Sequence, residues 1–230
     1  MTIIQVVAIT TLVVVSVACS SHELKVTPPS AASATTPVSN NGSAKNETRE
    51  QAIRKIDFAN FTYPWLSEFV DPQNPKKDLT ICSGELEPIR DDKNMVIEMG
   101  ASLESVVYGD VTRDGQDDAM VVLSIRTGAQ AMPRALYVYQ PNDQGAKLLW
   151  TVGFGDRENG GLRKVYADNS NLVIERYSPK DSKGACCPIY FNRQSYEWKG
   201  GKFRETGKLE VLPNTEGHSS PVMPRFEARP

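Results

Sequence analysis

Oxygen-bearing side chains recur at alternate positions in the segment GDVTRDGQDD, residues 109 to 118. Counted from Asp110, the ligands that it offers a hard cation are the side chains of Asp110, Thr112, Asp114 and Asp118 and the backbone carbonyl of Gln116. Gly115 stands at the sixth position, where a loop that wraps a cation must turn sharply. This spacing predicts a calcium site or, as the alternative, a tight turn whose side-chain oxygens bond its own backbone.

The flanking sequence excludes an EF-hand. The twelfth position, which needs a bidentate glutamate, is Val121, and Thr112 supplies only a neutral oxygen at the third. Apolar, strand-like runs stand on both sides of the loop in place of helices. The loop resembles the strand–loop–strand calcium loops of FG-GAP-type repeats, and we expect any calcium ion held there to be structural rather than catalytic.

The N-terminus has the features of an export signal. Met1 to Cys19 is apolar and uncharged but shorter and more interrupted than a membrane span, which predicts a signal peptide over residues 1–18. The ending Ser16-Val17-Ala18-Cys19 resembles a bacterial lipobox, in which the cysteine is acylated. We therefore expect a protein of the bacterial cell envelope, anchored to the membrane by lipid on Cys19. The alternatives are a secreted or periplasmic protein and an uncleaved anchor.

Three further cysteines follow, and an oxidising compartment favours a disulfide between two of them. Cys186 and Cys187 are adjacent, so their Cα atoms lie about 3.8 Å apart, which is shorter than a disulfide prefers. We therefore predict that Cys82 pairs with Cys186 or Cys187. A redox role for the adjacent pair is the alternative.

Composition excludes several classes of activity. The chain has two histidines, His22 and His218, and both lie outside the predicted folded core, so no Ser-His-Asp triad can form there. A net charge of −2 gives no reason to expect a nucleic-acid partner. A hydrolase that uses carboxylates stays open as an alternative, and its candidate acids are Glu85, Glu87, Glu98, Glu104 and Glu175.

Composition also divides the chain. Ser, Thr, Ala, Pro and Asn dominate the stretch after the leader, which predicts that residues 19–50 are a lipidated cysteine followed by a disordered tether. Residues 51–212 are predicted to form a β-rich domain and residues 213–230 a flexible tail. Within the domain, Phe61 to Leu66 is rich in aromatic residues and is expected to pack over a sheet rather than to form a recognition surface.

Short β-branched and aromatic runs separated by turn residues predict the strands of this domain. The expected strands are Met95–Met99, Ser105–Gly109, Ala119–Ile125, Leu136–Gln140, Lys147–Val152, Arg163–Ala167, Leu172–Tyr177, Ile189–Trp198 and Lys202–Leu212. Short hairpins require antiparallel pairing, so we predict a mainly β fold, an antiparallel meander forming a sandwich or barrel-like core. One short helix is predicted over Glu47–Phe58.

Three motifs together resemble the LppP/LprE group of bacterial lipoproteins. They are YGDVTRDG at residues 108–115, CCP at 186–188 and YEWKGGKF at 196–203. The resemblance implies an envelope lipoprotein without an assigned reaction. We therefore expect a non-enzymatic binding or structural β domain, with an unknown envelope protein or ligand as its partner and calcium as its only candidate cofactor. A metal-assisted, carboxylate-dependent hydrolase of the envelope is the alternative.

Overall fold

The computed structural model describes residues 52–69, 78–128, 132–143, 145–180 and 188–215, and strands make up most of these residues. The long strands are β6 (Gly100–Gly109), β7 (Asp118–Arg126), β8 (Arg134–Asn142), β9 (Gly145–Phe154), β10 (Leu162–Asp168), β11 (Asn171–Tyr177), β12 (Tyr190–Lys199) and β13 (Lys202–Pro213). The short ones are β1 (Thr62–Pro64), β2 (Asp78–Thr80), β3 (Glu85–Leu86), β4 (Ile89–Arg90) and β5 (Val96–Glu98). Every pairing among the described strands is antiparallel.

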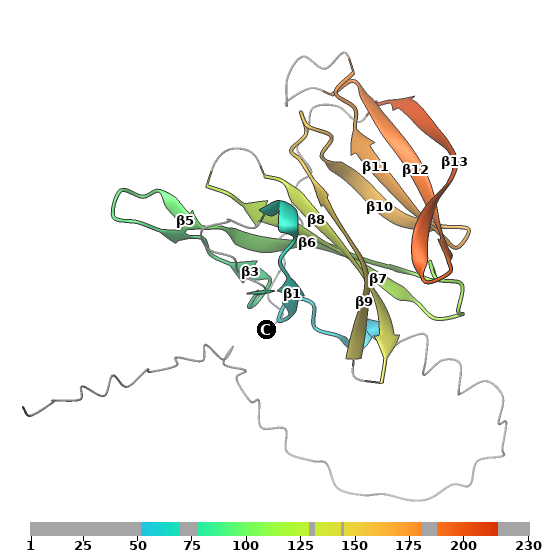
Figure 1. The fold of residues 1–230 in the computed structure, drawn as a ribbon, viewed down its shortest axis with the longest axis horizontal. Helices are drawn as coiled ribbons and strands as arrows, with labels where there is room; N and C mark the ends of the chain where they lie inside the picture. The colour runs from blue at the N-terminus through green and yellow to red at the C-terminus, as the bar shows by residue number, and fades with distance from the viewer. Residues whose placement is uncertain (1–51, 70–77, 129–131, 144, 181–187, 216–230) are drawn as a thin grey trace, which may run out of the picture. The chain divides into compact units, whose positions relative to one another are not determined.

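Two sheets form the body of the fold (Figure 1), one in the order β3-β6-β7-β8-β9 and one in the order β10-β11-β12-β13. Strand β7 lies inside the first sheet and is buried on both faces. Its alternate residues therefore enter two different cores, with Val121 and Leu123 in one and Met120 and Val122 in the other.

The second core lies between the two sheets. Met120 and Leu136 from the first sheet share it with Leu172 and Ile174 from the second. At one edge the Trp150 ring lies 5.2 Å from the ring of Tyr196 and 5.3 Å from that of Phe203. The predicted mainly β, antiparallel fold is thus confirmed in a sandwich-like form, and neither sheet closes on itself among the described residues.

The N-terminal segment covers the opposite face of the first sheet. Tyr63 is fully buried, and its ring lies 5.1 Å from that of Tyr137. The Tyr63 hydroxyl donates to the Phe58 carbonyl at 2.6 Å, and the Tyr137 hydroxyl donates to the Pro64 carbonyl at 2.9 Å. Phe61 and Trp65 pack against the same cluster, so the prediction that this aromatic segment packs over a sheet is confirmed.

The helix prediction needs correction within the described residues. Part of Glu47–Phe58 lies outside them, and the described part holds only the 3-10 turn η1 (Ile53–Lys55). Ile56 is already extended, with ψ 128°, and the Ala52 N-cap has no capping side chain, so nothing favours a longer helix. A second turn, η2 (Ser67–Phe69), follows β1.

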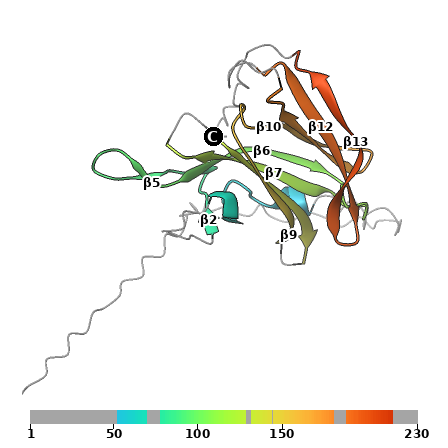
Figure 2. The ribbon, with the colours of Figure 1, turned by 45° about the horizontal axis from the view of Figure 1, so that its top comes forward.

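Each long strand overlaps its predicted range, although β6 begins at Gly100 rather than at Ser105. Short hairpins join β8 to β9, β10 to β11 and β12 to β13, as the predicted meander requires. The hairpin of β4 and β5 projects from the first sheet in both views (Figures 1 and 2). Its first strand was not predicted, because two residues carry no readable alternation. No helix of the described residues is long and apolar enough to cross a membrane.

Candidate functional site

The predicted acidic loop connects β6 to β7 and is closed from inside by Asp118. This residue is fully buried, and its Oδ2 accepts hydrogen bonds from the Val111 N–H at 3.0 Å and the Thr112 N–H at 2.9 Å. Its Oδ1 is buried without a hydrogen-bond partner, as is the Thr112 Oγ1. Burial raises the pKa of Asp118 to about 7, against the hydrogen bonds from Thr112 and Val111, which lower it.

The other two loop carboxylates also accept N–H donors. Asp110 Oδ1 accepts from the Asp114 N–H at 3.1 Å, and its Oδ2 accepts from the Gly115 N–H at 3.0 Å. Asp114 Oδ1 accepts from the Gln116 N–H at 2.9 Å, and its Oδ2 accepts from Gln140 Nε2 at 2.8 Å. Gly115 makes the turn with φ 81°, a conformation that other residues rarely adopt.

These contacts are the ones expected of the turn interpretation. Among the residues that the structure describes, no group of three or more Asp, Glu, His or Cys side chains is arranged to hold a metal ion. Calcium binding at Asp110, Thr112, Asp114, Gln116 and Asp118 stays a prediction. To bind calcium there, carboxylate oxygens of the loop would have to release the backbone N–H groups that now donate to them and coordinate the ion instead.

The loop is also fastened to its surroundings by two arginines. The Arg54 guanidinium pairs with Asp117 at 2.6 Å, and it lies 4.6 Å from the centre of the Tyr108 ring. Arg113 Nη2 donates to Asn171 Oδ1 at 2.9 Å, at the β10–β11 hairpin of the other sheet. The loop therefore holds the end of one sheet against the end of the other.

A groove of about 410 Å³ crosses the four-stranded sheet on the face opposite the second core. Its floor is a cross-strand row of small side chains, in which Val173 lies opposite Ser195 and Ser195 opposite Thr206. Tyr166 stands opposite Val173 and ends the row on β10. The groove exists because this row is small while its neighbouring side chains are long.

A bulge in β13 shapes one rim of this groove. Gln194 alone faces the three residues between Thr206 and Glu210, and its Nε2 donates to the Thr206 carbonyl at 2.9 Å. Gly207 takes φ 71° in the bulge, which lets the strand bend there. Lys208 follows and lines the rim.

The next row of side chains carries alternating charge across the sheet. Lys164 lies opposite Glu175, Glu175 opposite Arg193, and Arg193 opposite Glu210. Such opposite-charge pairs on neighbouring strands stabilise one register over its alternatives. The row forms one side of the groove, to which Arg193 and Glu210 contribute directly.

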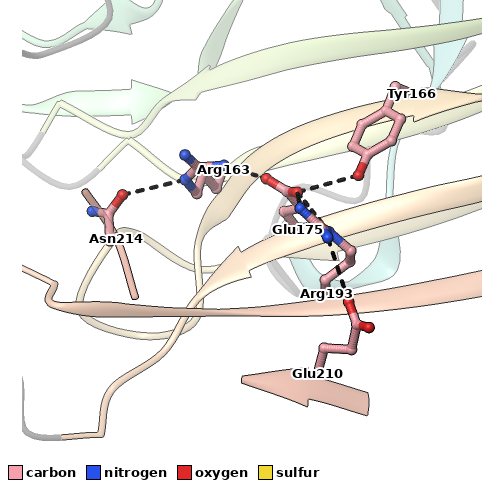
Figure 3. A network of polar contacts seen from close by, with 6 residues as sticks. All are labelled: Arg163, Tyr166, Glu175, Arg193, Glu210 and Asn214. Atoms are coloured by element: carbon pink, nitrogen blue, oxygen red, sulfur yellow. Dashed lines mark hydrogen bonds and ion pairs between the residues drawn. The ribbon is translucent and has the colours of Figure 1, made fainter. Parts of the chain in front are cut away.

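Glu175 is the centre of this row, with 2% of its side chain exposed. Figure 3 shows its carboxylate between two arginines: Arg163 Nη1 donates to Oε2, and Arg193 Nε donates to Oε1 at 3.0 Å. The Tyr166 hydroxyl donates to Oε1 at 3.3 Å, and Arg193 Nη1 reaches Glu210 at 3.4 Å. Burial and then the Glu175 charge raise the pKa of Tyr166, so its phenol stays a neutral donor.

Three of the four remaining predicted acids form ion pairs away from the groove, and the fourth, Glu98, lies in β5. Glu85 and Glu87 both bond Arg126, at 3.1 and 2.7 Å, and Glu104 pairs with Arg134. The structure therefore does not bring the five candidate acids into one cleft. Of these five, only Glu175 belongs to the groove's network.

Cys82 takes part in a disulfide. Cys186 and Cys187, the partners predicted for it, lie outside the described residues, so the pairing stays a prediction. Cys19, the predicted lipidation site, lies outside them as well.

Comparison of the chain with protein-family models, with curated proteins and with solved structures gives no match. The resemblance to the LppP/LprE lipoproteins accordingly stays a hypothesis.

The calcium prediction can be tested on the free energy of unfolding. Calcium at a hundredfold excess over its Kd would stabilise the native state by about 2.7 kcal/mol, a shift absent from Asp110→Ala. In chelator, Asp110→Ala should itself cost about 1–2 kcal/mol, because two loop N–H groups lose their acceptor. Urea unfolding in millimolar calcium and in chelator measures both.

The control is Asp143→Ala, which removes an exposed carboxylate from the β8–β9 turn. Equal stability of the wild-type protein with and without calcium would contradict the calcium prediction and leave the turn interpretation.

Asp118 makes stability depend on pH. Its folded-state pKa of about 7 lies above the ordinary value of 3.8, so between these values the folded protein holds a proton that the unfolded chain has released. The contribution of Asp118 to stability is therefore greatest at low pH and falls as pH rises toward 7, by up to about 4 kcal/mol. Asp118→Asn keeps an acceptor for the two loop N–H groups and should remove this dependence.

Urea unfolding between pH 4 and pH 8 compares the wild-type protein with Asp118→Asn, and Asp143→Asn is the exposed control. Parallel curves for the wild type and Asp118→Asn would show that Asp118 ionises normally.

Proposed function

We propose that this chain is a lipid-anchored protein of a bacterial cell envelope, whose β domain binds a ligand without transforming it. The single observation that carries the binding role is the groove across β10 to β13. Its small floor residues lie between fixed side chains, since Arg193 and Tyr166 are both hydrogen-bonded to the buried Glu175. Side chains held in place before binding lose little entropy on binding, which favours affinity.

The groove's carboxylates support binding over hydrolysis. A glycosidase-type mechanism needs one carboxyl group that donates a proton and a second that acts as base or nucleophile. Glu210 and Glu175 are both paired with Arg193, and Glu175 also with Arg163. Carboxylates that are already bonded to guanidinium groups are less available to a ligand, which supports binding over hydrolysis.

Anchoring rests on the leader and on Cys19. Export followed by acylation would place the domain on a tether at the membrane surface, where a groove on an exposed sheet face can meet envelope molecules. The acidic loop has a structural role in this domain, with or without bound calcium, because its Arg113 bonds the other sheet.

The anchor is tested by changing Cys19. In a bacterial host, the wild-type chain should incorporate labelled palmitate and sediment with membranes, and Cys19→Ala should do neither, because it lacks the acylated thiol. Cys82→Ala is the matched control and should keep the label. Label in Cys19→Ala would contradict the lipid anchor.

The binding role is tested by thermal unfolding of the full chain against four chemical classes, namely an oligosaccharide, inorganic phosphate, a tripeptide and a fatty acid. We expect at least one to raise the Tm of the wild type, because a ligand of the native state stabilises it. Thr206→Ile should abolish that shift by narrowing the groove floor. Thr80→Ile, the same change at an exposed position of β2, should preserve it. No shift with any class would contradict binding at the groove.

A further inference from the structure

The charges that line the groove balance, and the arginine among them is already paired. Arg193 and Lys208 oppose Asp168 and Glu210 around it. Arg193 is bound to two carboxylates, Glu175 at 3.0 Å and Glu210 at 3.4 Å, and so it offers no uncompensated cation. An anionic ligand would have to compete with these carboxylates, which favours an uncharged one.

Hydroxyl and amide groups dominate the rest of the lining. Ser195 and Thr206 carry hydroxyls on neighbouring strands, and such strands lie about 4.8 Å apart. Asn171 adds a side-chain amide at the hairpin end, where its Oδ1 accepts from Arg113. Each hydroxyl both donates and accepts, so the lining matches a ligand whose own groups do the same.

Apolar surface accompanies these groups at the end of the row. The Tyr166 ring stands there, next to Val173, which has 2% of its surface exposed. A tyrosine ring combines an apolar face with a polar tip, and the Tyr166 hydroxyl is held by Glu175. Alternating hydroxyls and C–H faces are the surface chemistry of a sugar.

We propose that the groove binds a short stretch of uncharged oligosaccharide, laid across the strands from Tyr166 toward Thr206. This inference rests on the proposed binding function and specifies its ligand class. The floor hydroxyls bond sugar hydroxyls, and the Tyr166 ring contacts sugar C–H groups. Three strand spacings give the groove a span of roughly 14 Å, which suits a few sugar units rather than one.

Isothermal titration of the full chain with maltotriose and with triacetylchitotriose tests this proposal. At least one trisaccharide should bind with a Kd in the millimolar range or below. Thr206→Ile should weaken binding about tenfold, because a floor hydroxyl is lost and the floor narrows. Thr80→Ile should leave the Kd unchanged. If Thr206→Ile lowers the Tm, Ser195→Ala replaces it and removes a hydroxyl without adding volume.

Inorganic phosphate and triglycine are titrated in parallel, so that failure of the saccharide proposal can be distinguished from failure of the binding function. If neither trisaccharide binds, and if phosphate or triglycine binds and Thr206→Ile weakens that binding, the saccharide proposal is overturned and the binding function stays intact. No binding by any probe would overturn both. Cleavage of a bound trisaccharide, followed by chromatography of the titrated sample, would overturn binding without transformation.

Discussion

The burial of β7 on both faces is the constraint on which the rest of the structure depends. Ala119 to Ile125 have at most 3% of their surface exposed, so no residue in this run can turn toward water. One face needs the N-terminal aromatic segment as its cover, and the other needs the four-stranded sheet. Because the strand period is two, a slip of one residue would exchange the contents of both cores. The register of β7 therefore fixes both layers around it.

Asp118 stands at the first position of this strand and is the one buried charge-bearing group in it. Its Oδ2 supplies the acceptor for two N–H groups of a loop that has no strand partner there. Leaving those buried donors unsatisfied would cost about 1–3 kcal/mol each, whereas a neutral carboxyl retains an acceptor at little cost. The pKa of Asp118 is raised by its burial, and the two N–H bonds that close the loop offset this rise only in part.

Sequence alone predicted the long strands because alternation and turn residues are local signals. It found the loop residues for the same reason, since they lie within ten positions. It missed the groove, because Tyr166, Val173, Ser195 and Thr206 become one row only through the pairing of four strands. The Arg163–Glu175–Arg193 network was missed likewise. Glu175 was one of five acids, and nothing in the chain order pointed to its two partners.

The Arg163–Glu175–Arg193 network contributes orientation of side chains, whereas the two apolar cores contribute stability. Removing two charges from water costs several kcal/mol per ion, and apolar residues of similar size often serve stability equally well. What Glu175 provides is orientation: it holds Arg193 and Tyr166 on the groove side of the sheet. Arg113 has a parallel effect at the hairpin end, where it holds Asn171 from a loop 58 residues away in the chain. The groove is thus a product of both sheets, since its walls depend on a buried carboxylate in one and a loop arginine from the other.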